Sequence, residues 1–515
     1  MSGGATRICV VMILTINGHD YRYEMENVCR LFLPQEAVKV GEDDGGSGVR
    51  ALTAVTREPD GVRLTASLRL DDWARSLEET VPDSVPEEER QLERRLAVLL
   101  YRLFAEAFGF SHQWGAVTGV RPVKLLRRLS QKMGEDAAVR WLQKNLLVGD
   151  AKADLCRRTL REENRLLALS RPDSFSLYVS IPFCPTRCDY CSFVSHTVER
   201  AAKLIPDYVD CLCREIEATG EISRRLGLRL ETVYIGGGTP TTLSAEQLRR
   251  VLGTIGRSLD LSSLREYTVE AGRPDTITEE KLRALKECGV TRVSINPQTL
   301  QDSVLQAIGR RHTAAQFFEA FALARKCGFA NLNADLIAGL PGDDVEGFRQ
   351  SLDGIIRLRP ESITVHALAM KRASNLVAHR RADFSGGEQA VRMVSYSGER
   401  LSAEGYRPYY LYRQSRAAGN MENVGWALPG SEGLYNVYIM DETHTILACG
   451  AGAVTKLKQP DGDRIERVFN FKFPYEYIGR FDELLQRKER VIPFYETDVP
   501  QALPEAGGDQ PLGAR

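Results

Sequence analysis

The chain has 515 residues, of which 43% are hydrophobic, and its 68 Lys and Arg nearly balance its 69 Asp and Glu. This composition excludes a wholly disordered chain, and at about 150 residues per domain the length predicts two or three domains. The formal net charge of -1 argues against binding along a nucleic-acid backbone, which needs a basic excess. We therefore expect a globular protein without a nucleic-acid partner.

The sequence contains 11 cysteines, an odd number that does not suggest a disulfide framework in a chain of this length. A reducing compartment fits better. The first apolar run, residues 8–16, is too short to span a bilayer and leads into a polar turn without a small-residue cleavage site. We interpret this run as a strand and expect a cytoplasmic protein with no membrane span.

The first 170 residues predict an α+β extension, whose role the sequence does not reveal. Residues 8–16 and 21–25 are expected to form strands on either side of a turn at Asn17. Residues 51–70 are expected to form a hairpin, because two strand-like runs flank a Pro-Asp-Gly turn. Apolar residues at helical spacing from Leu92 onward then predict a helix.

More helices are predicted over residues 121–169, ahead of the segment that carries the chemistry. The first part of this stretch is basic, with four Lys or Arg among residues 121–128. Such a stretch can dock a partner, but a solvated helix face is the interpretation that we favour.

From about residue 175 the pattern becomes a repeat of strand, glycine or proline turn, and helix. This alternation predicts an α/β fold with a parallel sheet, and the number of strands favours a partial (β/α)6 barrel over a complete eight-stranded one. The candidate strands are residues 177–182, 232–236, 266–270, 292–296, 331–337 and 362–368. The candidate helices between them are residues 244–259, 278–288, 314–327 and 345–358.

These patterns divide the chain into four parts. Residues 1–170 are the N-terminal α+β extension and residues 171–380 the partial barrel. Residues 381–496 form a mixed, aromatic C-terminal region on the substrate side, and residues 497–515 a tail rich in Pro and Gly that is predicted to be disordered.

Cys184, Cys188 and Cys191 are the strongest chemical signal in the sequence. They follow a predicted strand so closely that their sulfurs can turn toward one point and hold a soft metal or an iron-sulfur cluster. Three thiolates leave one iron of a cluster open, and an open iron can chelate a small molecule and pass it an electron. A zinc site completed by His196 is the alternative.

The run Gly236-Gly237-Gly238-Thr239 follows the second predicted strand. Consecutive glycines let the backbone approach a ligand closely, although a tight strand-to-helix turn explains them equally simply. The run lacks the Lys-Ser/Thr ending of a nucleotide P-loop, which argues against a phosphate site.

Polar residues gather at the carboxyl ends of the predicted strands, the face at which parallel barrels place their active sites. Glu270 ends the third strand, Gln298 follows the fourth, and Asp335 lies in the carboxyl half of the fifth. A buried carboxylate in the core needs a partner, so the functional interpretation of Glu270 and Asp335 is favoured. For His366, in the sixth strand, packing and function stay equally open.

The motifs Cys184-Pro-Thr-Arg-Cys-Asp-Tyr-Cys191, Gly236-Gly-Gly-Thr-Pro240 and Asp335-Leu-Ile-Ala-Gly-Leu-Pro-Gly342 resemble those of the radical S-adenosylmethionine (SAM) enzymes related to oxygen-independent coproporphyrinogen oxidase. The resemblance covers residues 175–460. Together with the long N-terminal extension and the segments 408–414 and 419–425, it is strongest to the HemZ-type coproporphyrinogen dehydrogenases.

The resemblance implies that the three cysteines hold a [4Fe-4S] cluster whose open iron binds the amino and carboxylate groups of SAM. The matched positions that would contact this cofactor are Tyr178, Gly237 and Glu270. The positions that match a second SAM site are Tyr190, Gly238, Thr239, Gln298, Arg310, Asp335 and Ala369. An acidic side chain suits a ribose hydroxyl or an ammonium group, and Arg310 suits a carboxylate.

Two departures from the oxidase pattern concern substrate handling and the second SAM site. Where that pattern has His two residues after the Tyr, this chain has Ser180, and where it has a further Cys, this chain has Ser192-Phe193. The cluster ligands themselves are unaffected.

The resemblance implies oxidative decarboxylation of two propionates of coproporphyrinogen III to the vinyl groups of protoporphyrinogen IX, in heme biosynthesis. A low-potential donor such as flavodoxin or ferredoxin would supply electrons. Cationic and aromatic candidates for holding the substrate are Lys371, Arg372, Tyr409, Tyr412 and Arg413, with surface or packing roles as the alternative. A heme chaperone without decarboxylase activity, or a radical enzyme acting on heme itself, stays open.

Overall fold

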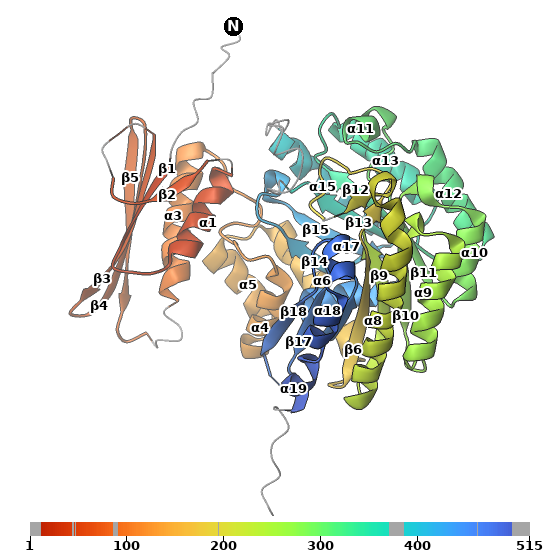
Figure 1. Ribbon diagram of the computed structural model, residues 1–515. Helices are drawn as coiled ribbons and strands as arrows, with labels where there is room; N and C mark the ends of the chain where they lie inside the picture. Colours follow the sequence, from red (N-terminus) through yellow and green to blue (C-terminus); the bar gives the residue numbers. More distant parts are fainter. Residues whose placement is uncertain are drawn as a thin grey trace, which may run out of the picture.

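The computed structural model describes residues 12–34, 36–43, 46, 48–85, 91–193, 195–369, 386–460 and 462–496. The described strands form three sheets, of five, eleven and two strands. Figure 1 shows the five-stranded sheet in a lobe of its own and the large sheet in the other lobe, surrounded by helices. The predicted tail, residues 497–515, lies outside the described residues.

The small lobe is a sheet with the strand order β2-β1-β3-β4-β5, covered by α1 and α3. β3 and β4 are antiparallel and joined by a tight turn, which confirms the predicted hairpin. The bounds are β1 Met12–Asn17, α1 Arg22–Phe32, β2 Val38–Val40, β3 Val49–Glu58, β4 Gly61–Leu70, β5 Trp73–Pro82 and α3 Leu92–Phe108.

The strand predicted over residues 21–25 is wrong, because this segment begins helix α1. Met25, Val28, Cys29 and Phe32 are its buried residues, and their spacing of three and four places them on one helical face. Five residues were too short a window to show this period.

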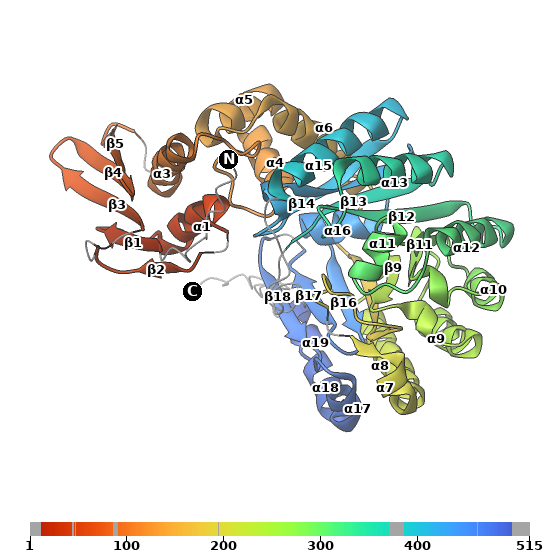
Figure 2. The same ribbon diagram turned by 90° about the horizontal axis from the view of Figure 1, so that it is seen from above.

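Helices α4, α5 and α6 lie between the small lobe and the large sheet (Figures 1 and 2). The prediction that the basic stretch is a solvated face is wrong, because Arg121 Nη1 and Lys124 Nζ lie 2.6 and 3.0 Å from Glu442 Oε2. These pairs hold α4 against the C-terminal region. The bounds are α4 Pro122–Met133, α5 Glu135–Leu146 and α6 Asp150–Leu167.

The large sheet confirms the predicted partial barrel. Its order is β14-β15-β13-β12-β11-β10-β9-β6-β16-β17-β18, and the strands from β13 to β16 are all parallel. β6, β9, β10, β11, β12 and β13 are the six predicted strands. β16, from the C-terminal region, adds a seventh parallel strand that was not predicted, and the sheet stays open.

The parallel strands are β6 Ser174–Ile181, β9 Arg229–Gly237, β10 Glu266–Gly272, β11 Arg292–Ile295, β12 Asn331–Ala338, β13 Ser362–Ala367 and β16 Thr445–Cys449. The edge strands, all antiparallel, are β14 Arg407–Arg413, β15 Glu422–Ala427, β17 Val454–Lys458 and β18 Ile465–Phe469. The short sheet pairs β7 Phe183–Cys184 with β8 His196–Thr197.

The helices between the parallel strands are α7 Val198–Ala201, α8 Ile205–Arg225, α9 Ala245–Ser258, α10 Glu279–Glu287, α11 Asp302–Ala307, α12 Ala314–Lys326 and α13 Val345–Arg357. The C-terminal helices are α15 Gly386–Ala403, α16 Leu434–Asp441, α17 Pro474–Gly479, α18 Phe481–Lys488 and α19 Val491–Glu496. Short 3₁₀ turns cover Ala202–Leu204, Pro240–Thr242, Pro274–Thr276 and Ala418–Asn420.

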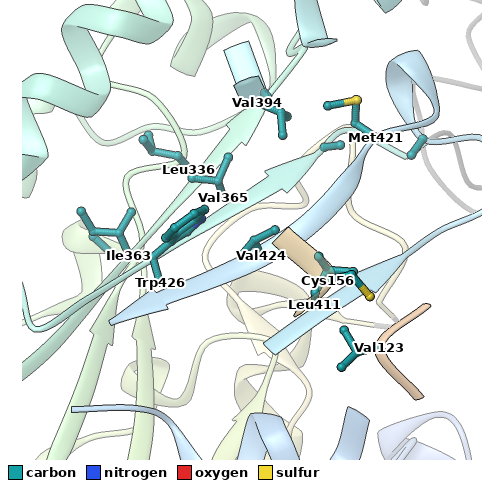
Figure 3. Packing of buried hydrophobic residues seen from close by; sticks show 14 of the residues in the cluster. Val123, Cys156, Leu336, Ile363, Val365, Val394, Leu411, Met421, Val424 and Trp426 are labelled. Atoms are coloured by element: carbon teal, nitrogen blue, oxygen red, sulfur yellow. The ribbon is translucent and has the colours of Figure 1, made fainter. Parts of the chain in front are cut away.

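One hydrophobic core joins the N-terminal helices to the barrel edge. In Figure 3, Val123 and Cys156 lie beside Leu411, and Trp426 lies among the side chains of the neighbouring strands. A buried ion pair reinforces this contact, because Lys152 Nζ lies 2.6 Å from Glu422 Oε1. The N-terminal helices therefore support β14 and β15 directly.

Within the described residues, no helix is both long enough and apolar enough to cross a membrane.

Candidate active site

The cysteine loop begins where β6 ends. Cys184 lies on β7, which pairs with β8. The rest of the loop is attached to the turn after α11, because Asp189 N–H donates to the Ile308 carbonyl at 3.0 Å and Thr186 Oγ1 to the Gly309 carbonyl at 2.9 Å. The three thiols therefore lie on a loop held from two sides.

Cys184 and Cys188 each have a polar side chain as a neighbour. Thr239 Oγ1 donates to Cys184 Sγ at 3.6 Å, and Arg273 Nη1 to Cys188 Sγ at 3.8 Å. Burial raises the pKa of Cys184, and it raises that of Cys191 to about 11. Binding of metal must therefore release protons from these thiols.

The zinc alternative requires the three cysteines and His196 to converge on one ion. Among the described residues, which include the three cysteines and His196, no group of three or more His, Cys, Asp or Glu side chains converges on one metal ion. A four-iron cluster needs its thiolates farther apart than zinc does, because each thiolate binds a different iron. The ten cysteines of the described chain are all free.

The glycine run lies against the start of the cysteine loop. Gly237 has φ +104°, and a Cβ there would lie 2.9 Å from Ser180 Oγ. Gly238 N–H donates to the Ile181 carbonyl at 2.8 Å, and Thr239 N–H to the Phe183 carbonyl at 2.7 Å. Glycine is therefore required here for close approach between two segments of the chain itself.

Glu270 lies inside the barrel and accepts a hydrogen bond from the Tyr234 hydroxyl. Burial and the nearby Asp335, opposed by the hydrogen bond from Tyr234, raise the pKa of this carboxyl to about 7. The Tyr178, Tyr234 and Tyr435 rings stack beside it, with 4.5 Å between the centroids of Tyr234 and Tyr435. Glu270 is thus an acid poised to change charge near neutral pH.

Asp335 accepts a hydrogen bond from Asn333 Nδ2 at 2.7 Å and lies 3.8 Å from His366 Nε2. Burial raises the pKa of Asp335, but the His366 and Asn333 contacts outweigh it and the net shift is downward. The Tyr412 hydroxyl lies 3.5 Å from His366 Nδ1. His366 therefore faces the polar interior of the barrel.

Gln298, Arg310 and Tyr190 form the side of the site near the cysteine loop. Arg310 Nη1 donates to the Tyr190 hydroxyl at 2.8 Å. Gln298 has φ +71°, which is uncommon for a residue with a side chain, and its buried Oε1 has no hydrogen-bond partner. A strained residue with an unsatisfied acceptor fits a position that receives a ligand.

The structure thus brings most of the predicted residues together at the carboxyl ends of the strands. Ala369 lies just after β13, where its backbone pairs with that of Ala417. Among the substrate candidates, Lys371 and Arg372 lie outside the described residues.

Two of the remaining substrate candidates have packing roles. Tyr409 belongs to a hydrophobic cluster with Leu434 and Tyr438. Arg413 is buried, lies over the Trp114 ring at 5.5 Å and donates to Asn420 Oδ1 at 2.6 Å. Tyr412, beside His366, is the candidate that faces the site.

Sequence reasoning missed Arg273, Asp275, Tyr234 and Tyr435. Arg273 and Asp275 follow β10 directly, and two opposite charges immediately after a strand of the site could have drawn attention to them. No sequence signal identifies Tyr435, because it reaches the site from α16, far along the chain.

The residues present fit a cluster and a chelating cofactor. Three free thiols share one loop, while Glu270, Asp335 and the unsatisfied Gln298 Oε1 lie at the adjacent strand ends. Thiolates suit iron, and carboxylates suit a cofactor that carries ammonium and hydroxyl groups.

Comparisons with known proteins agree with this chemistry. Residues 178–355 match the radical SAM superfamily. The oxygen-independent coproporphyrinogen-III oxidase-like protein HemZ of Bacillus subtilis is 36% identical over 491 residues, covering 93% of this chain and 98% of HemZ. The heme chaperone HemW of the same organism is 35% identical over 246 residues, covering 47% of this chain and 64% of HemW.

Among solved structures, coproporphyrinogen III oxidase (HemN) from Escherichia coli, described as a radical SAM enzyme, aligns with a TM-score of 0.48 and 23% identity. The alignment covers 62% of this chain and 72% of that one. The family identification depends on HemZ, which matches along almost its whole length. The chain therefore belongs to the radical SAM superfamily, whose cofactors are a [4Fe-4S] cluster and SAM, and within it to the HemZ family.

Proposed function

We propose that this protein is a coproporphyrinogen dehydrogenase, which converts two propionates of coproporphyrinogen III to vinyl groups without oxygen. The observation that carries the proposal is the match to HemZ over 93% of the chain, which includes the N-terminal extension and the C-terminal region as well as the barrel. The HemW proteins, in contrast, match between 47% and 60% of the chain.

Cys184, Cys188 and Cys191 would hold the cluster, and Tyr178, Gly237 and Glu270 would contact the SAM bound to it. When bound, cluster and SAM together supply the 5'-deoxyadenosyl radical that removes a hydrogen atom from the propionate. The chain's own part is orientation and exclusion of water. Glu270, with its pKa near 7, offers a negative charge to the cationic cofactor at and above neutral pH.

Tyr190, Gly238, Thr239, Gln298, Arg310, Asp335 and Ala369 would form a site for a second SAM. The unsatisfied Gln298 Oε1 and the carboxylate of Asp335 support this part of the proposal. Ser180 and Phe193 depart from the oxidase pattern, so the number of SAM molecules bound must be measured. Equilibrium binding of labelled SAM to the reconstituted protein gives it directly.

The proposal also assigns the parts of the chain. Residues 1–170 support the barrel edge through α6, residues 171–380 carry the cofactors, and residues 381–496 face the substrate. A low-potential donor such as flavodoxin or ferredoxin would deliver electrons in the cytoplasm. Tyr412, beside His366 and Asp335, is the described residue that we assign to the tetrapyrrole.

The test is an anaerobic assay of the reconstituted protein with coproporphyrinogen III, SAM and a reductant. We expect protoporphyrinogen together with 5'-deoxyadenosine. Cys188→Ala should abolish both products, because the cluster would lose a ligand. Cys327→Ala, at the end of α12 and remote from the cysteine loop in sequence, is the matched control and should keep turnover. Full turnover in the Cys188→Ala variant would contradict the mechanism.

A heme chaperone is the second candidate, favoured by the 35% identity to HemW over 246 residues. A chaperone should bind heme stoichiometrically and form no protoporphyrinogen in the same assay. Consumption of heme with coproporphyrinogen left untouched would instead identify a radical enzyme that acts on heme itself.

A further inference from the structure

Arg273 is a buried cation next to the cysteine loop, immediately after β10. Its side chain is 4% exposed, and it forms a two-bond ion pair with Asp275, with Nε to Oδ1 at 3.0 Å and Nη2 to Oδ2 at 2.9 Å. This paired geometry fixes the plane of the guanidinium. Its remaining nitrogen, Nη1, therefore points in a defined direction.

Nη1 points at the cysteine loop. It donates to Thr186 Oγ1 at 2.9 Å and to Cys188 Sγ at 3.8 Å. Thr186 Oγ1 in turn donates a hydrogen bond to the Gly309 carbonyl. Arg273 thus holds the loop between Cys184 and Cys188 and also places an N–H and a positive charge against one sulfur.

Arg310, the other buried guanidinium nearby, is used differently. Its N–H groups donate to the Tyr190 hydroxyl, to the Asn296 and Gly272 carbonyls and toward His312 rather than to a sulfur. The hydroxyl groups of Thr239 and Ser195, which carry no charge, contact Cys184. Arg273 is therefore a charged side chain that donates directly to one of the three thiols.

We propose that Arg273, oriented by Asp275, tunes the reduction potential of the cluster through its contact with the Cys188 sulfur. The inference depends on the proposed assignment of Cys184, Cys188 and Cys191 as cluster ligands. Hydrogen bonds to cluster sulfurs and nearby net charge both set the potential of such clusters. A cation beside a sulfur stabilises the form that has gained an electron, so Arg273 makes the cluster easier to reduce by a low-potential one-electron donor.

The experiment is a potentiometric titration of the reconstituted protein with dithionite, followed by EPR of the reduced cluster. Arg273→Gln should disfavour the one-electron reduction about tenfold, a midpoint about 59 mV more negative. Arg273→Lys keeps the charge and should recover much of this shift. Arg283→Gln removes an exposed arginine from the pair with Glu279 on α10 and should leave the midpoint unchanged.

Asp275→Asn gives the sharpest test, because it keeps Arg273 and removes the compensating negative charge. Its midpoint should move in the opposite direction, to a less negative value. This variant also keeps the inference falsifiable if Arg273→Gln disturbs the loop. Shifts of the same sign in the Arg273→Gln and Asp275→Asn variants, or no shift in either, would overturn the inference.

Failure of the cluster assignment itself has a different signature. A wild-type protein that binds no iron through the three cysteines after reconstitution would overturn the assignment and the tuning together. If the cluster forms and its midpoint potential is the same in the wild-type protein and in all variants, the inference about Arg273 is wrong. The proposed function is then unaffected.

Discussion

Two glutamates at opposite ends of the parallel strands have opposite surroundings. Glu231, near the start of β9, is fully buried and accepts hydrogen bonds from Ser174 Oγ at 2.6 Å, Arg229 Nη1 at 2.8 Å and Tyr438 Oη at 3.0 Å. Burial raises its pKa, but these partners and His444 outweigh it and the net shift is downward. Glu231 is an ionised, fully paired structural group.

Glu270, near the end of β10, has the Tyr234 hydroxyl as its side-chain partner and faces a second carboxylate, Asp335, which pushes its pKa up. The same residue type therefore stabilises one end of the barrel as a paired carboxylate. At the other end it can gain or lose a proton near neutral pH. The difference teaches that incomplete pairing, rather than burial alone, distinguishes the candidate active site from the core.

Removing the paired glutamate should produce the largest loss of stability. Glu231→Ala leaves Arg229 and Arg265 beside an emptied buried site, so the free energy of unfolding should fall by about 3–5 kcal/mol. Urea denaturation measures this. Glu221→Ala, on the exposed face of α8, is the matched control and should change it by less than about 0.5 kcal/mol. Equal losses of unfolding free energy in the Glu231→Ala and Glu221→Ala variants would contradict the structural role of Glu231.

Glu270→Gln should act in the opposite direction on stability. The raised pKa means that, between about pH 4.5 and 7, the unfolded chain loses this proton while the folded protein keeps it. Wild-type stability therefore falls as the pH rises through this interval, and the variant avoids that cost. Because the side chain stays partly exposed, the gain should be about 1–3 kcal/mol above pH 7 and vanish near pH 4.

The same Glu270→Gln variant should bind SAM about tenfold more weakly, because a negative charge facing a cationic cofactor is gone. Urea denaturation at several pH values and equilibrium binding of SAM measure the two effects. A stability gain that does not depend on pH, or unchanged SAM affinity, would remove Glu270 from the proposed site.

Two glycine substitutions should change stability in opposite directions, and Gly256→Ala should give the smallest effect. Gly237→Ala forces a side chain into a left-handed backbone and to 2.9 Å from Ser180 Oγ, so stability should fall by about 1–3 kcal/mol. Gly256→Ala lies in α9, where a Cβ meets nothing within 4 Å, and should raise stability by about 0.5–1 kcal/mol. Thermal unfolding compares them, and a neutral Gly237→Ala would show that the close approach is unimportant.

Much of the barrel could be predicted from sequence because its signals are local. Each parallel strand is a short apolar run bounded by turn residues, and helices such as α9 and α12 begin with a capping box. The strand predicted over residues 21–25 failed for the same reason, because a local window shorter than a helical turn and a half cannot reveal a period of 3.6.

The candidate site was predictable where its residues follow strands in chain order. The strand ends of a parallel sheet meet at one edge, so Cys184, Gly237, Glu270 and Asp335 could be grouped without coordinates. The sequence could not show which of these side chains lack hydrogen-bond or ion-pair partners. That depends on side-chain direction and on neighbours such as Tyr234 and His366, which lie on other strands.

The sequence by itself determined the cysteine loop, the glycine run and the positions of the six strands along the chain, because each is encoded within a few consecutive residues. Only the tertiary structure decided that β16 adds a seventh parallel strand, that Tyr435 stacks on Tyr234, and that Arg273 points at Cys188. These contacts join segments far apart in the chain. They arise from the packing of whole elements, which no local pattern of residues specifies.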